Sequence, residues 1–149
     1  GGDTLFASMY AAFEALSEPM QSFLSGLSAL HASEHVYRGR YGVKEDPGRK
    51  FPEAVHPVVR THPVTGRKGL YVNPSFTLKI QELKRRESEA LLRMLYGHMA
   101  HPEFHCRFRW QKHSIALWDN RCTQHFAMWD YYPQVRHGLR VTIKGDRPF

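Results

Sequence analysis

A histidine and two arginines near the carboxyl end of the chain have the types and spacing of a site for an anion or a metal. His125 ends the dense segment Trp118-Asp119-Asn120-Arg121-Cys122-Thr123-Gln124-His125, and Arg136 and Arg140 follow it. Residues four apart on an extended strand share a face, so both guanidinium groups are expected to face one cavity. Buried guanidinium groups need anionic partners, and their planar forks match carboxylates and sulfonates.

Spacing alone leaves other readings of these residues open. His125 could be a structural residue, with Arg136 and Arg140 on the surface. A catalytic pair of the Cys122 thiol and His125 is a further alternative, although it lacks an orienting partner. Cys106 lies on the apolar side of an alternating segment, which predicts a place in the core.

Helices are expected in the first third of the chain and again after its middle. Apolar residues at helical spacing predict one helix over residues 7–16 and a second over 17–31. Ser17 is the expected N-cap of the second helix, and Pro19 lies in its first turn. A third helix is predicted over 87–99, where apolar residues again share one face.

The remaining segments indicate a loop and several strands. Glycines and prolines punctuate residues 32–54, which predicts a long loop or a lid. The turn sequence Pro63-Val64-Thr65-Gly66 indicates a hairpin. Strands are predicted over residues 55–61, 69–72, 104–110, 115–118 and 139–143. This pattern favours an α+β chain built on a β-sandwich or jelly roll, as a single domain over 1–149 whose sheet is incomplete in this chain.

Composition narrows the class of protein. The 149 residues carry a formal net charge of +7, with 42% hydrophobic and 13% aromatic residues, which is enough for one folded domain. The basic residues are scattered, and the run Lys84-Arg85-Arg86 has acidic neighbours, so we expect a solvated face and no nucleic-acid partner. A basic nucleic-acid-binding domain stays an alternative on net charge alone.

No stretch resembles a membrane span or a signal peptide, and two cysteines exclude a disulfide scaffold. A reduced cytoplasm is therefore the expected setting.

Several blocks of residues follow one another in a fixed order along the chain. They are Gly1-Gly2-Asp3-Thr4-Leu5, Ala11-Ala12-Phe13-Glu14-Ala15-Leu16, His56-Pro57-Val58-Val59-Arg60-Thr61-His62-Pro63, Leu70-Tyr71-Val72-Asn73, Phe76-Thr77 and Trp118 to His125 with Arg136 and Arg140. In this order they resemble the taurine dioxygenase family of Fe(II)/2-oxoglutarate-dependent oxygenases. The resemblance covers nearly the whole chain and implies a double-stranded β-helix (jelly-roll, cupin-like) core with flanking helices.

The resemblance implies roles in binding iron and the cosubstrate. Such iron is held by a His-x-Asp pair and a distal histidine, with open coordination positions. His125 matches the distal ligand. Thr4 and Arg136 match the threonine and arginine that bind the far carboxylate of 2-oxoglutarate.

The same resemblance implies how a small anionic substrate is held. Arg140 matches the arginine that binds the anionic group, Phe76 matches an aromatic wall of the pocket, and Trp118 matches a ring close to the iron. The implied reaction hydroxylates an alkyl sulfonate such as taurine, and gives aldehyde and sulfite with succinate and CO2. An alkyl sulfate ester or an aryloxyacetate is the alternative substrate.

The chain departs from the family pattern at the first two metal ligands. It contains no His-x-Asp, and we take its one His-x-acid sequence, His101-Pro102-Glu103, as a coincidence at a helix end. The simplest interpretation is the carboxy-terminal part of a dioxygenase whose pair lies upstream of Gly1. A non-catalytic anion-binding fragment without iron also fits. Relatives are commonly oligomers, so a homo-oligomer remains an option that no residue here locates.

Overall fold

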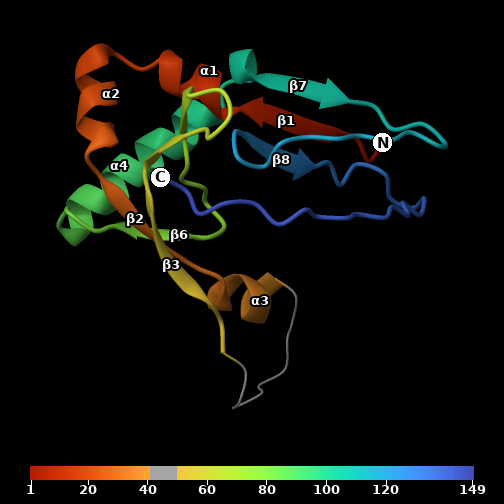
Figure 1. The fold of residues 1–149 in the computed structure, drawn as a ribbon. Helices are drawn as coiled ribbons and strands as arrows, with labels where there is room; N and C mark the ends of the chain where they lie inside the picture. The colour runs from red at the N-terminus through yellow and green to blue at the C-terminus, as the bar shows by residue number, and fades with distance from the viewer. Residues whose placement is uncertain (41–49) are drawn as a thin grey trace.

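The computed structural model describes residues 1–40 and 50–149, and Figure 1 shows them as small sheets flanked by helices. The elements in chain order are β1 (Thr4–Ser8), α1 (Met9–Glu14), α2 (Glu18–Ser25), β2 (Ser28–Ala32), α3 (Glu34–Arg40), β3 (Glu53–Pro57), β4 (Val59–Thr61), β5 (Lys68–Leu70), β6 (Thr77–Ile80), α4 (Arg85–Met99), a 3-10 turn (Pro102–Phe104), β7 (His105–Phe108) and β8 (Thr123–Ala127).

The described strands form three antiparallel sheets. Their orders are β7-β1-β8, β3-β2-β6 and the hairpin β4-β5. Helix and sheet are thus mixed as the sequence predicts, but the sheets described here do not close into a jelly roll. The hairpin around the turn at 63–66 is confirmed, although the predicted strand 55–61 divides into β3, which pairs with β2, and β4.

The amino-terminal helix prediction was partly wrong. Residues 4–8 form a strand, and α1 starts only at Met9, where the Ser8 hydroxyl accepts a hydrogen bond from the Ala11 amide at 3.3 Å. The second predicted helix ends at Ser25, because residues 28–32 pair with two strands as β2. The apolar residues of β2 fit either period, and pairing across the sheet decided between them.

Two other regions also differ from the predictions. The predicted loop 32–54 contains α3 and the start of β3, while residues 41–49 lie outside the described part of the chain. Residues 115–118 and 139–143 form no strand, and Leu139, Val141 and Ile143 are each at least 86% exposed. Their alternation is that of a strand, but among the described residues no neighbouring strand supplies hydrogen bonds.

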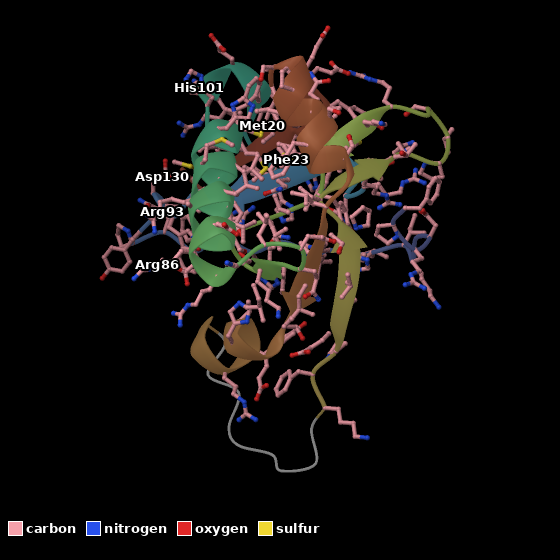
Figure 2. All side chains as sticks on the ribbon, turned by 90° about the vertical axis from the view of Figure 1, so that its left-hand side faces the viewer. Met20, Phe23, Arg86, Arg93, His101 and Asp130 are labelled. Carbon is pink, nitrogen blue, oxygen red and sulfur yellow. The ribbon has the colours of Figure 1, made fainter. Side chains whose placement is uncertain are left out.

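Helix α4 forms one wall of the core. Leu92, Leu95 and Met99 are buried on its inner face. The helix predicted over 87–99 is confirmed, but Ala90 and Met94, which the apolar spacing placed on the buried face, are exposed. Its outer face is charged, and Figure 2 shows Arg86 and Arg93 on that side. The basic run at its start thus lies on a solvated face. No helix within residues 1–40 and 50–149 has the length and apolar character needed to cross a membrane.

Two histidines lie against each other on the β3-β2-β6 sheet. The His31 and His56 rings are 5.3 Å apart between centroids, and both lie within 6.0 Å of the Tyr71 ring. Burial lowers the pKa of His31 from 6.5 to about 4, and His56 acts in the same direction. Burial also lowers the pKa of His56, with the charges of Arg147 and Arg60 adding to the effect.

This pair predicts a loss of stability in mild acid. Because the folded pKa of His31 is depressed, the unfolded state binds the proton first, and stability is lost as the pH falls from 6.5 toward 4. Between pH 7 and pH 4.5, wild type should lose roughly 1–2 kcal/mol more unfolding free energy than His31→Asn, after discounting for partial exposure. Urea unfolding at both pH values measures this, with the exposed His101→Asn as control. Equal losses in wild type and His31→Asn would contradict it.

Candidate active site

One face of the β7-β1-β8 sheet carries two of the candidate residues, Thr4 and His125, together with Phe6. Thr4 pairs with Phe108 on one side and Ala127 on the other, and Phe6 pairs with His125. Residues paired across strands, and residues two apart on one strand, point to the same face. The Thr4, Phe6 and His125 side chains therefore share a face.

His125 lies within a group of aromatic rings. Its ring centroid is 5.2 Å from that of Trp118 and 6.4 Å from that of Phe6, and these two rings are 5.0 Å apart. His125 is exposed to solvent, yet its partial burial lowers its pKa, and the charge of Arg140 adds to the effect. The neutral imidazole that this favours is the form that binds a metal ion.

Thr4 and Arg136 are joined through Trp110, the last residue of the alternating segment 104–110. The Trp110 indole Nε1 donates a hydrogen bond to Thr4 Oγ1 at 2.9 Å, and Thr4 is buried. The guanidinium carbon of Arg136 lies 5.8 Å from the centroid of a Trp110 ring. Thr4 and Arg136, which are predicted to bind one carboxylate, thus contact the same tryptophan. The Thr4 hydroxyl meets its N–H, and the Arg136 guanidinium lies over its ring.

The amino-terminal glycines fit closely against the same region. Gly2 has a φ of +76°, and a Cβ added there would lie 2.8 Å from Arg136 Cδ. The Gly2 amide donates to Asp130 Oδ1 at 2.7 Å, and Asp3 pairs with Arg107 at 2.7 Å. The start of the chain is therefore held where only glycine leaves room for the Arg136 side chain.

Arg136 and Arg140 are both exposed on the segment after β8. This segment forms no strand, so the expected strand that would turn both side chains toward one cavity is not found. Arg136 reaches Trp110, and the charge of Arg140 reaches His125. Further along, Asp146 accepts a 2.6 Å hydrogen bond from the buried Arg60, and the Phe149 carbonyl accepts one from the Thr61 amide at 2.7 Å. Figure 1 shows this segment running back from the open end of the β7-β1-β8 sheet. The segment is therefore fixed near its start by the contact of Arg136 with Trp110, and at its end by the hydrogen bonds of Asp146 and Phe149.

Phe76 and Cys106 do not have the surroundings that the sequence predicts. Phe76 is 40% exposed on the turn before β6, and none of the ring contacts found among the described residues joins it to Trp118 or His125. Cys106 is exposed, so its predicted place in the core was wrong. It pairs with Phe6 on the face that carries His125, and that face of the sheet is open at Cys106.

A second group, His62, Asp119 and Cys122, has ligand atoms within 4.8 Å of one another. His62 Nδ1 accepts hydrogen bonds from the Val64 and Thr65 amides, so its proton is on Nε2 and donates to Asp119 at 3.1 Å. A metal on Nε2 would move that proton to Nδ1, against two N–H donors. Asp119 also pairs with Arg121, which holds the pKa of this carboxyl well below its usual range. We therefore assign this group to holding two loops together.

Cys122 belongs to this group by its contacts. Its sulfur lies 3.8 Å from the Asp119 carbonyl and 3.9 Å from the Thr123 hydroxyl, and it also interacts with Tyr10. Asp119 lies in the loop before β8, Thr123 begins β8 and Tyr10 lies in α1. None of the Cys122 contacts found among the described residues is with His125, so the structure offers no support for a Cys122–His125 pair.

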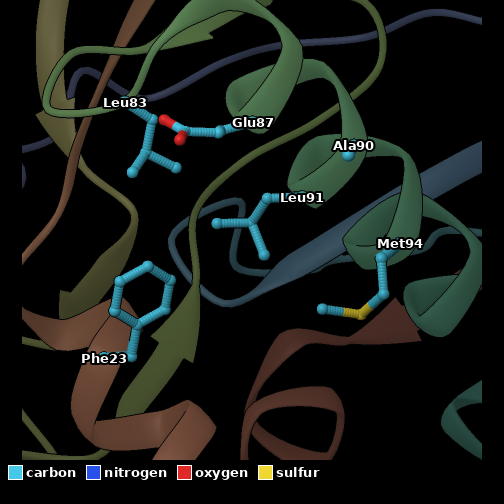
Figure 3. Close-up of a pocket in the computed structure, with 6 residues that line it drawn as sticks. All are labelled: Phe23, Leu83, Glu87, Ala90, Leu91 and Met94. Atoms are coloured by element: carbon cyan, nitrogen blue, oxygen red, sulfur yellow. The ribbon is translucent and has the colours of Figure 1, made fainter.

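A shallow apolar hollow lies between α2 and α4, away from the strands that carry His125 (Figure 3). Its walls are Phe23, Leu83, Glu87, Ala90, Leu91 and Met94. Figure 2 shows Met20 and Phe23 on the side of α2 toward α4. Glu87 is the one charged residue of this wall, and its carboxylate accepts from the Lys84 amide at 2.9 Å. The hollow thus has little to bind an anion.

Sequence reasoning missed Trp110 and Gly2. The alternation over 104–110 marked Trp110 as one of several apolar residues, and nothing in spacing shows that its N–H meets Thr4. Two adjacent glycines before Asp3 and Thr4 were a usable signal, since glycine is favoured where the backbone needs a positive φ or a close approach.

Comparison with known proteins adds a family to this geometry. The model of the taurine catabolism dioxygenase TauD, TfdA family matches residues 1–142. An alpha-ketoglutarate-dependent sulfonate dioxygenase of Saccharomyces cerevisiae is 44% identical, over 99% of this chain and 36% of that protein. An alpha-ketoglutarate-dependent sulfate ester dioxygenase of Pseudomonas putida is 36% identical, over 99% of this chain and 52% of that protein.

Solved structures agree with the sequence matches. The crystal structure of a taurine dioxygenase from Burkholderia xenovorans has a TM-score of 0.74 and 41% identity, and covers 89% of this chain and 43% of that one. The chain therefore spans about half, or less, of the length of these relatives. With the family model matched from Gly1 to Thr142, the chain belongs to the taurine catabolism dioxygenase TauD, TfdA family.

Proposed function

We propose that this chain is part of an Fe(II)- and 2-oxoglutarate-dependent dioxygenase that hydroxylates a small anionic substrate, with an alkyl sulfonate as the first choice. The observation that carries the proposal is the grouping around one sheet of His125, the Thr4–Trp110–Arg136 contact and the charge of Arg140. It provides one metal ligand and two separate cationic groups. Two anions, a cosubstrate and a substrate, match that set.

The chain's own residues fit the cosubstrate. A buried hydroxyl at Thr4 and a guanidinium at Arg136 are donors of the kind that a carboxylate accepts. We assign them to the far carboxylate of 2-oxoglutarate. Oxidative decarboxylation of this cosubstrate to succinate and CO2 would supply two of the electrons that reduce O2, which is the oxidant of the reaction. The rings of Phe6 and Trp118 beside His125 help to exclude water.

His125 fits iron as one ligand of three. A neutral imidazole is a ligand that Fe(II) accepts, and the two-histidine, one-carboxylate set leaves positions open for other groups. Among the described residues no group of three or more metal-ligating side chains includes His125, and the His-x-Asp sequence is absent from the chain. We therefore assign the remaining two ligands to a His-x-Asp pair outside residues 1–149.

Arg140 is assigned to the anionic group of the substrate. By fixing that group it sets which carbon faces the reacting centre, and holding reactants in one geometry is a large part of catalysis. Hydroxylation of the carbon that bears a sulfonate gives an unstable product, which collapses to an aldehyde and sulfite. Phe76, which is 40% exposed, is assigned to a wall of the pocket.

A substrate panel tests the choice of substrate. The protein as its source makes it is supplied with Fe(II), 2-oxoglutarate, oxygen and one of taurine, an alkyl sulfate or an aryloxyacetate. Sulfite release in step with succinate supports the sulfonate, while sulfate release or phenol release supports one of the alternatives. Succinate formation that no member of the panel stimulates would remove small anions of these three classes.

The fold and setting are proposed on the same basis. We propose that residues 1–149 are one part of a double-stranded β-helix domain, since the relatives that share this chain's arrangement are taurine dioxygenases. In that arrangement the exposed alternating residues 139–143 form a strand against chain outside this region. A cytoplasmic enzyme, free of membrane and nucleic-acid partners and able to assemble with copies of itself, completes the proposal.

Gly2→Ala should impair the binding of 2-oxoglutarate, although it adds only one methyl group. The new methyl group would lie 2.8 Å from Arg136 Cδ, at a φ of +76° that alanine disfavours, so Arg136 must move. In a titration of 2-oxoglutarate into the Mn(II)-loaded protein, we expect the Kd to rise roughly tenfold. This rise corresponds to a loss of about 1.4 kcal/mol of binding free energy. Gly97→Ala is the control, because a Cβ there meets no atom within 4 Å. Unchanged binding in Gly2→Ala would show that Arg136 does not need this space.

A further inference from the structure

We propose that Trp110 is a positioning residue for 2-oxoglutarate, which orients the Thr4 hydroxyl through its N–H and supports the Arg136 guanidinium on its ring. The inference rests on the proposed function, and it adds a residue with no direct contact to the cosubstrate. Its evidence is one hydrogen bond and one ring contact on the same side chain.

The hydrogen bond decides where the Thr4 proton can go. An indole N–H can only donate, so Thr4 Oγ1 is the acceptor in the 2.9 Å contact with Trp110 Nε1. The hydroxyl proton of Thr4 is then free to donate to another group. Thr4 is 4% exposed and β-branched, so its side chain has little freedom to turn away. A carboxylate is the acceptor that such a directed hydroxyl would bind best.

The ring contact restricts a side chain that is otherwise exposed. Arg136 lies after β8 on a segment without regular structure, where a guanidinium has many rotamers to lose on binding. The Trp110 ring attracts it at 5.8 Å through a cation–π interaction. The close approach of Gly2 to Arg136 Cδ limits it further. Binding an anion then costs less conformational entropy.

Trp110 is itself held in place by the sheet. Its ring lies edge-on to that of Phe108 at 4.9 Å and 75°, and Phe108 pairs with Thr4 in the β1–β7 register. The ring is half-buried. Contact with Trp110 therefore fixes the position of the Arg136 guanidinium relative to β1 and β7, although Arg136 belongs to neither strand.

Calorimetric titration of 2-oxoglutarate into the Mn(II)-loaded protein, as its source makes it, tests this. Trp110→Phe keeps a ring under Arg136 but loses the donor, and the Kd should rise roughly 3- to 10-fold. Trp110→Leu loses both contacts and should weaken binding further. Trp129→Phe is the matched control, because Trp129 is 70% exposed and no hydrogen bond of its indole is found among the described residues.

Two readouts separate positioning from a general structural role. Trp110→Phe should raise the KM for 2-oxoglutarate and leave the KM for the anionic substrate unchanged. In a Thr4→Val background, Trp110→Phe should have little further effect on the Kd, because its hydrogen bond has no acceptor left. Melting temperatures of all variants check that each is folded.

The outcomes are distinct. Wild-type affinity in Trp110→Phe, or an undiminished effect of that change in the Thr4→Val background, would overturn the inference while the proposed function stands. A parallel rise in both KM values would overturn it as well, since it would indicate general damage. A wild-type protein that binds no 2-oxoglutarate would overturn the proposed function and this inference together.

Discussion

His125→Ala should abolish succinate formation from 2-oxoglutarate. His125 is the one imidazole in the group formed with Phe6 and Trp118, and among the described residues it belongs to no group of three or more metal-ligating side chains. Removing groups that only orient a metal ligand typically costs 10- to 100-fold in affinity or activity, so loss of the ligand itself should exceed about 100-fold. Succinate assay and Fe(II) binding are the two measurements.

The control for this variant is another histidine. His101→Ala removes an exposed ring from the turn after α4, at the His-x-acid sequence that we take as a coincidence. It should keep wild-type activity. Full activity in folded His125→Ala would rule out the ligand assignment, and a loss in His101→Ala would show that the coincidence was wrongly dismissed.

Arg140→Ala should weaken substrate binding far more than 2-oxoglutarate binding. Hydrogen bonds to charged groups contribute about 1.5–3 kcal/mol, so the KM for the anionic substrate should rise roughly 10- to 100-fold. The Kd for 2-oxoglutarate should change little, because Thr4 and Arg136 hold that anion. Arg136→Ala should show the opposite pattern.

Arg109→Ala is the matched control for charge. It removes the same unit charge from the exposed side of the segment after β7, one residue before Trp110. If Arg109→Ala matched Arg140→Ala, the effect would be general electrostatic attraction. If Arg140→Ala weakened both anions equally, the separate roles of the two arginines would be wrong.

The elements that the sequence predicted well are those with complete local signals. Helix α4 shows apolar residues at helical spacing over four turns, and the β4–β5 hairpin has Pro63 and Gly66 at its turn. Errors arose where pairing with distant residues decides the state. Residues 28–32 pair with β3 and β6, which no local window shows.

The site followed the same division. Resemblance to a family assigned His125, Arg136 and Arg140 to the metal, the cosubstrate and the substrate. The structure shows His125 on the same face as Thr4 and shows Arg136 against Trp110, while the roles of the three residues stay predictions. The exposure of Cys106 and the lack of a strand at 139–143 could not be predicted from alternation. Alternation says which residues share a face, but coverage of that face depends on other strands.

One measurement tests the central claim most directly. The protein as its source makes it is given Fe(II), oxygen, 2-oxoglutarate and taurine, and succinate and sulfite are both measured over time. The account predicts that the two appear together, one sulfite for each succinate, and that omission of either Fe(II) or 2-oxoglutarate stops both. No consumption of 2-oxoglutarate with any anionic substrate of the panel would contradict the proposed function.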